Sequence, residues 1–110
     1  MRQIERQMNE AILNRKDFRK DNTEVYNYYC ADKNCTASIV KLHGNTIAKI
    51  DDTLQICDAG WQTVTTKSRL NALLNEFADG CYVFQKNFDW FLGDRDGNKI
   101  PFPTEEFVTV

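Results

Sequence analysis

The sequence predicts an α+β fold in which residues 1–110 form a single domain built on one mainly antiparallel sheet. Three observations lead to this fold class. Two segments have helical periodicity, short β-rich segments alternate with turn signals, and the order along the chain is helix, strands, helix, strands. A chain of 110 residues also suits one hydrophobic core better than two, because each of two smaller cores would be marginal.

The first element is an amphipathic helix over residues 2–17, with a charged face opposite its apolar stripe. The apolar side chains recur at helical spacing: Ile4, Met8, Ala11 and Ile12. A meander of short strands is expected next, from β-branched and aromatic content over residues 25–30, 37–43, 46–50 and 54–57. Gly44-Asn45 is a two-residue hairpin signal within this meander.

A central amphipathic helix at about 66–78 follows. Its apolar stripe has the i, i+3, i+4, i+7 pattern: Leu70, Leu73, Leu74 and Phe77. We expect Thr65 or Thr66 to cap its N-terminus and Gly80 to end it. Residues 82–92 then read as strand, broken near Asn87, with a return strand over 99–102 and a loosely held tail over 103–110.

Charge and hydropathy narrow the classes of function. The net charge of −2 and the pI near 5.3 give no general attraction to nucleic acid. The N-terminus lacks the apolar core of a signal peptide, and no apolar stretch reaches the length of a membrane-spanning helix. We therefore expect a cytoplasmic protein with no membrane partner, and nothing in the composition calls for a cofactor.

The four cysteines are expected as thiols in a reducing compartment. Cys30 and Cys35 flank a polar turn, and together with Cys57 and Cys81 they raise the idea of a zinc site. The spacing does not repeat as it does in structural zinc sites, so ordinary thiols are the favoured interpretation.

No catalytic arrangement stands out. His43 is the only histidine and sits beside a turn, which is a poor place for a base paired with Cys57 or Cys81. Asp51, Asp52 and Asp58 suggest an acid–base or metal cluster, but Asp51 and Asp52 are adjacent turn residues whose usual role is backbone hydrogen bonding, and a metal site would need more preorganised oxygen ligands. We expect a protein without enzymatic activity.

Three motifs carry a resemblance to known proteins: LHGNTIA at the start of residues 42–50, GWQTVTTKSRLNALL at 60–74, and FQKNFDWF within 83–92. Over residues 42–92 the chain resembles a family of small uncharacterised proteins of tailed bacteriophages. The resemblance implies a viral protein that works in the cytoplasm of a bacterial host, and it supplies no biochemical activity.

The first binding hypothesis concerns the start of the central helix, where hydroxyls, two cations and a flat ring gather. The candidate residues are Trp61, Thr63, Thr65, Thr66, Lys67, Ser68 and Arg69. Free N–H groups at a helix N-terminus favour anions, and Trp61 could stack on a base, which suits a nucleic acid or nucleotide phosphate. Alternatively, the threonines cap the helix, Trp61 closes the core and the cations are solvated.

The second hypothesis is that the protein binds a host protein and modulates or inhibits it, in host takeover or counter-defence. It rests on six aromatic residues: Tyr26, Tyr28, Tyr29, Phe88, Trp90 and Phe91. Neighbouring strand residues point to opposite faces, so some of these rings should be exposed and available to a partner. Alternatively, the N-terminal helix covers the second face and buries every ring. The net charge makes a host protein the favoured partner and nucleic acid the second choice.

Overall fold

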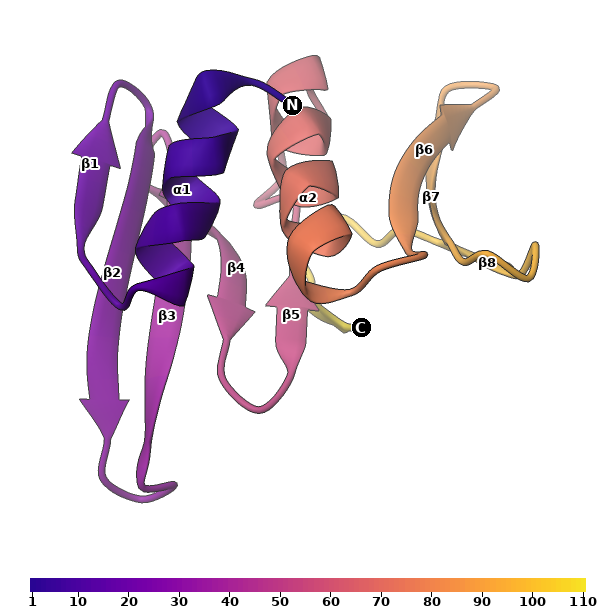
Figure 1. Ribbon diagram of the computed structural model, residues 1–110. Helices are drawn as coiled ribbons and strands as arrows, with labels where there is room; N and C mark the ends of the chain where they lie inside the picture. The colour runs from indigo at the N-terminus through magenta and orange to yellow at the C-terminus, as the bar shows by residue number, and fades with distance from the viewer.

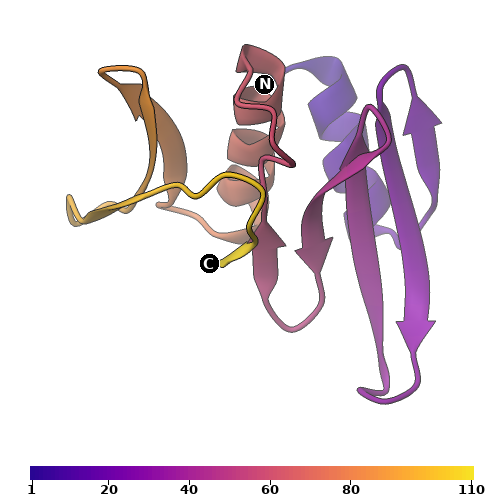
Figure 2. The ribbon, with the colours of Figure 1, turned by 180° about the vertical axis from the view of Figure 1, so that it is seen from behind.

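Both helices lie on one face of a six-stranded antiparallel sheet in the computed structural model, which describes residues 1–110 (Figure 1). Figure 2 shows the other face of this sheet, over which no helix lies. The helices are α1 (Gln3–Leu13) and α2 (Val64–Phe77). The strand order is β1-β2-β3-β4-β5-β9, with the bounds β1 Phe18–Lys20, β2 Thr23–Cys30, β3 Cys35–Leu42, β4 Asn45–Ile50, β5 Leu54–Ile56 and β9 Val108–Thr109. The α+β prediction is confirmed.

The predicted meander is present, with one shift at its central turn. Each of the four expected strands appears within about two residues of its predicted bounds, which is ordinary boundary scatter. The hairpin turn, however, is His43-Gly44 and not Gly44-Asn45, because Leu42 pairs with Asn45. Both turn residues have positive φ, 53° and 79°, as a two-residue hairpin turn of this kind requires.

Helix α1 is shorter than the predicted helix over 2–17. It ends at Leu13 because Arg15 adopts a φ of 54° and turns the chain toward β1. The N–H of Lys16 then donates to the carbonyl of Ala11, and the N–H of Arg15 to that of Ile12, which together form a Schellman ending. The residues after Leu13 are thus free to form an additional edge strand.

Helix α2 begins earlier than predicted, and its cap is Thr63. The Thr63 hydroxyl oxygen accepts a hydrogen bond from the backbone N–H of Thr66 at 3.1 Å, so neither Thr65 nor Thr66 is the capping residue. The predicted stripe is confirmed for Leu70, Leu73 and Leu74, all of which are fully buried in the core.

The remaining strands form a second sheet, so the prediction of a single sheet is wrong. The strands β6 (Tyr82–Lys86), β7 (Asp89–Gly93) and β8 (Lys99–Pro101) pair in the order β6-β7-β8. This sheet stands beside α2, away from β1 and β2 (Figure 1). The Asn71 side chain of α2 bonds both the N–H and the C=O of Val83, at 2.7 and 2.9 Å, and so fastens β6 to the helix.

The C-terminal residues explain why the two sheets stay separate. Residues 103–110 are not the loose tail that the sequence predicts, because β9 pairs with β5 and the N–H of Val110 donates to the carbonyl of Leu54 at 2.8 Å. The side chain of Phe102 is also buried against Trp90. Because β9 occupies the edge of β5, the β6–β8 sheet cannot extend the larger one there.

Candidate functional site

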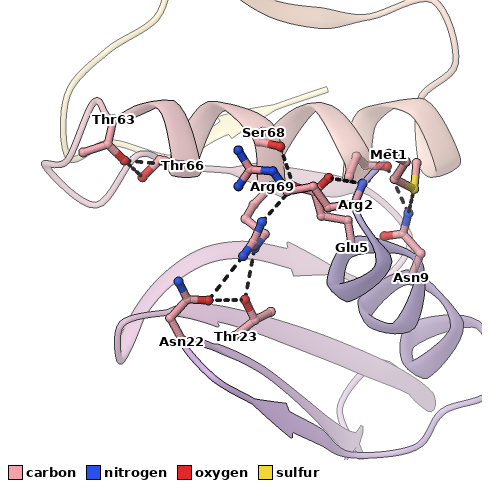
Figure 3. Close-up of polar contacts among 11 residues, drawn as sticks. Met1, Arg2, Glu5, Asn9, Asn22, Thr23, Thr63, Thr66, Ser68 and Arg69 are labelled. Atoms are coloured by element: carbon pink, nitrogen blue, oxygen red, sulfur yellow. Dashed lines mark hydrogen bonds and ion pairs between the residues drawn. The ribbon is translucent and has the colours of Figure 1, made fainter.

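Arg69, a central residue of the predicted anion site, is a core residue. Its Nη1 lies 2.8 Å from Glu5 Oε2 of α1, and the two side chains are 4% and 3% exposed. Its Nε donates to the Thr23 hydroxyl at 3.0 Å and its Nη2 to the Asn22 side-chain oxygen at 3.3 Å (Figure 3). The guanidinium therefore links α2 to α1 and β2, and the prediction that it meets an external anion is corrected.

Three further residues of the motif, Thr63, Thr66 and Ser68, have internal partners. The Ser68 hydroxyl donates to Glu5 Oε2 at 2.6 Å, and the buried Thr66 lies at the helix cap with its hydroxyl 3.0 Å from that of Thr63 (Figure 3). We call Glu5, Asn22, Thr23, Ser68 and Arg69 the Glu5 network. A buried pair of charges is tolerated only when hydrogen bonds surround it, and this network supplies them.

Trp61, Thr65 and Lys67 remain accessible at the start of α2. Trp61 is 63% exposed, so the alternative in which its ring closes the core is wrong. Its ring borders a cleft of about 500 Å³ between the β3–β4 turn and α2, which Thr63, Thr65, Thr66, His43 and Asn45 also line.

The buried carboxylate at this cleft is fully occupied by the protein itself. Asp58 accepts hydrogen bonds from the N–H groups of Gly60 and Glu105, at 2.8 and 2.9 Å, and from the Gln62 amide at 3.0 Å. Asp58 thus holds the loop before α2 against the C-terminal segment. It presents no unpartnered charge to a ligand.

The six predicted aromatic residues do not form one surface. Tyr26, Tyr28 and Tyr29 belong to β2, whereas Phe88, Trp90 and Phe91 belong to the β6–β7 hairpin on the other side of α2 (Figure 1). Trp90 is only 4% exposed, with its ring centroid 6.0 Å from that of Phe102. Trp90 is therefore part of the core, and the prediction that it contributes to a surface is corrected.

The outward side of the β6–β8 sheet carries a row of aromatic rings. Tyr82, Phe84 and Phe91 share this side with Pro101, because Phe84 pairs with Phe91, which pairs with Pro101. Adjacent ring centroids lie 5.4 Å apart for Tyr82 and Phe84 and 5.5 Å apart for Phe84 and Phe91. The Lys99 ammonium lies 4.9 Å from the Phe91 centroid. We call Tyr82, Phe84, Phe91 and Pro101 the aromatic face.

Gly93 lets the rings of the aromatic face close together. A Cβ atom at this position would lie 3.0 Å from the Phe84 ring and 3.1 Å from that of Tyr82. Sequence reasoning missed Tyr82 and Phe84. Their alternation on one strand, opposite Phe91 and Gly93 on the next, is the signal that could have found them.

Phe88 lies at the tip of the β6–β7 hairpin. It is 90% exposed, and its φ is 71°, following Asn87 at 51°. A bulky side chain at positive φ is rare, since glycine is the preferred residue at this position of a two-residue hairpin turn. The hairpin therefore holds a large apolar ring in solvent at a backbone position that disfavours it.

The cysteines and carboxylates are the remaining candidates for chemistry. Cys30 and Cys35 are half-buried and directly opposite each other on β2 and β3. No three His, Cys, Asp or Glu side chains gather so as to hold a metal ion. Burial raises the pKa of the Cys57 thiol, and its sulfur accepts the Ala59 N–H at 3.2 Å. Less thiolate is then available at neutral pH.

Asp51 lies outside the core and keeps a local role. The N–H of Thr53 and the Lys33 ammonium, 3.0 Å away, hold the pKa of Asp51 at about 2. This arrangement closes the β4–β5 turn, as the interpretation of Asp51 as a turn residue requires.

Comparison with known proteins identifies the family. A family model described as Kyanoviridae Gp96 protein matches residues 1–109, nearly the whole chain. The chain belongs to this family of phage proteins. The Gp96 match confirms the resemblance to small tailed-phage proteins and extends it from residues 42–92 to include α1, β1, β2 and the C-terminal strands.

No curated protein and no solved structure matches the chain. Neither α1 nor α2 combines the length and the apolar character needed to cross a membrane. The geometry of the exposed residues must therefore carry any argument about function.

Proposed function

We propose that this chain is a non-enzymatic phage accessory protein that binds a host protein in the host cytoplasm and modulates or inhibits it. The contact surface in this proposal is the aromatic face with Phe88 at its edge. It requires no cofactor. Host takeover and counter-defence are the biological settings that the proposal fits.

The observation that carries the proposal is Phe88. A residue forced to positive φ costs roughly 1–2 kcal/mol, and an exposed phenyl ring returns nothing to the isolated fold. Burying such a ring against a partner contributes about 1.5–3 kcal/mol. An aromatic anchor that is strained and solvated in the free protein is therefore understandable as part of an interface.

The neighbouring charges favour a protein partner at this site. Three basic residues, Lys86, Arg95 and Lys99, are balanced by three acidic ones, Asp89, Asp94 and Asp96, in the same small sheet and its turns. A surface of mixed charge around apolar rings resembles the rim and core of a protein interface. Nucleic acid would instead require an excess of cations.

The experiment is affinity capture of the tagged protein from nuclease-treated host lysate, with the Phe88→Gly variant in parallel. Glycine suits the turn, so this variant should fold at least as well as the wild type. We expect a protein captured by the wild type to be reduced roughly tenfold or more by Phe88→Gly, the loss typical of an interface hot spot. Leu13→Gln on α1 is the matched control, because Leu13 is 58% exposed on a different element. Equal capture by all three proteins would contradict the proposal.

Nucleic-acid binding at the start of α2 is the second candidate, supported by the exposure of Trp61 at the cleft that Thr65 also lines, with Lys67 in the first turn of α2. Changing Lys67 and Arg69 together does not test it, since removing Arg69 breaks the Glu5 network. Lys67→Ala alone is the suitable variant, because Lys67 forms no ion pair. Unchanged oligonucleotide binding in Lys67→Ala would rule out this site.

A further inference from the structure

The face of the six-stranded sheet that carries no helix has its own composition. Val25, Val40 and Ile56 point toward the helices and are buried. Successive residues of a strand point to opposite faces, so the residues next to them along each strand point to the open face. One row of paired residues crosses this open face from Tyr26 to Ile39 to Lys49. Tyr28 lies beside it, opposite Ala37, whose exposure is only 2%.

Two tyrosine rings on this face are partly free. Tyr26 is 40% exposed and Tyr28 37% exposed, and they occupy alternate positions of β2. Successive residues on one side of a strand are about 7 Å apart, given a rise of about 3.4 Å per residue. The Lys41 ammonium lies 5.5 Å from the centroid of the Tyr26 ring, so a cation already accompanies the first ring.

Charge on this sheet differs in sign from that of the whole protein. The six strands contain four basic residues, Arg19, Lys20, Lys41 and Lys49, and one acidic residue, Glu24. Glu24 is paired with Arg19 at 3.3 Å, whereas Lys41 and Lys49 form no ion pair. In a chain of net charge −2, the sheet is therefore a local positive region, and Lys41 and Lys49 lie on the same face of it as Tyr26 and Tyr28.

We propose that this open sheet face, formed by Tyr26, Tyr28, Lys41 and Lys49, binds single-stranded RNA. Unstacked bases stack on exposed aromatic rings, and the phosphates meet the lysines. The partner is RNA rather than DNA because both rings are tyrosines, whose hydroxyls can donate to or accept from a ribose 2′-hydroxyl. A double helix is excluded as the main ligand because its bases are not available for stacking.

This site is distinct from the proposed protein-binding surface. It uses β2, β3 and β4, and it shares no residue with the aromatic face or with Phe88. Phe88→Gly should therefore leave RNA binding unchanged, so failure of either proposal can be recognised separately. The sheet face is also separate from the candidate nucleic-acid site at the start of α2.

The test is fluorescence anisotropy with labelled oligouridine of about 12 nucleotides, a length within the site sizes of single-strand-binding folds. The same length of oligothymidine and an RNA duplex are the comparison ligands. We expect the wild type to prefer oligouridine to both. We also expect replacement of Tyr26 and Tyr28 together by Ala to weaken binding roughly tenfold or more. Tyr29→Ala is the matched control, because Tyr29 is 62% exposed on the same strand but faces the other side.

Two further variants keep the test decisive if the double alanine variant unfolds. Tyr26→Phe with Tyr28→Phe should retain stacking but lose the preference for oligouridine over oligothymidine. Lys41→Ala with Lys49→Ala should flatten the plot of log affinity against log salt by about 0.7 for each phosphate that the protein no longer neutralises.

Four outcomes would overturn the proposal. They are absence of oligouridine binding at low salt, equal binding of oligothymidine, an equal loss in Tyr29→Ala, and a salt slope unchanged by removing both lysines. Capture of a nuclease-resistant protein that depends on Tyr26 and Tyr28, without RNA binding, would assign the face to a protein partner instead.

Discussion

The Glu5 network and the aromatic face are built in opposite ways. In the network, every charged group meets a partner inside the protein, and the Glu5 and Arg69 side chains are almost completely buried. Around the aromatic face, rings stay in contact with water and Phe88 stands at a strained position of the chain. Stability accounts for the network but not for Phe88. The comparison indicates that residues which the isolated fold does not need are the better guide to function here.

The largest expected effect is the loss of the Glu5–Arg69 pair. Arg69→Ala leaves the Glu5 carboxylate buried without its partner, so the free energy of unfolding should fall by about 3–5 kcal/mol. Urea denaturation measures this change. Lys67→Ala, two residues earlier on α2, is the control and should change it by less than about 0.5 kcal/mol. If the two variants lost similar amounts of free energy of unfolding, Arg69 would be no more important to stability than a surface residue, and the account of the Glu5 network would be wrong.

The two sides of the small sheet should also respond differently. Trp90→Ala removes a buried ring and should lower the free energy of unfolding by about 3–5 kcal/mol. Phe91→Ala, on the half-exposed outward side, should cost clearly less. Thermal and urea denaturation of the two variants measure the change in the free energy of unfolding. A larger loss of stability for Phe91→Ala than for Trp90→Ala would contradict the assignment of Trp90 to the buried side and Phe91 to the outward side of the sheet.

The cap of α2 gives a smaller and more local effect. Thr63→Ala removes the oxygen that accepts the Thr66 N–H, and it should lower the free energy of unfolding by about 1 kcal/mol. Thr65→Ala should have almost no effect. If Thr65→Ala proved the more damaging change, the cap would be the one that the sequence suggests.

Phe88→Gly should act in the opposite direction from the other changes. Relief of the positive φ should leave the free energy of unfolding equal or raise it by up to about 1 kcal/mol, offset in part by the freedom glycine adds to the unfolded chain. Denaturation measures this sign. A marked destabilisation would mean that Phe88 supports the fold, and its exposure would then be no evidence for a binding partner.

The surface pair Lys33–Asp51 should contribute less to stability than the buried pair Glu5–Arg69. A folded-state pKa of about 2, below the ordinary value of 3.8, stabilises the protein above the unfolded pKa, and this contribution is lost as the pH falls toward 2. NMR titration of the Asp51 carboxyl should report the low pKa. Lys33→Met should move it upward only partly, because the Thr53 N–H remains. No upward movement at all would show that Lys33 does not act on Asp51.

Local patterns in the sequence are enough to predict most of the fold. The strands of the meander, the stripe of α2 and the break near Asn87 depend on spacing and turn residues that act over short distances. Such local patterns cannot predict the division into two sheets, because it depends on residues 103–110 pairing with β5, which lies half the chain away in the sequence.

The candidate site is harder to predict for a related reason. Arg69 looks like an accessible cation in the sequence, but its burial depends on Glu5, which is 64 residues away in the chain. Trp90 and Phe91 are adjacent aromatic residues that look alike in the sequence. Only the pairing of β7 with β6 and β8 shows that the Trp90 ring lies in the core and the Phe91 ring on the outward side. Exposure of Phe88, by contrast, follows from its place in a hairpin turn.

The most direct measurement is site-specific photo-crosslinking in host lysate with a photoreactive phenylalanine analogue at position 88. The matched control carries the same analogue at position 13, where Leu13 is also exposed but lies on α1. Our account predicts a discrete, nuclease-resistant crosslink to a host protein from position 88 and none from position 13. The absence of a crosslink from position 88, or the same products from both positions, would contradict it.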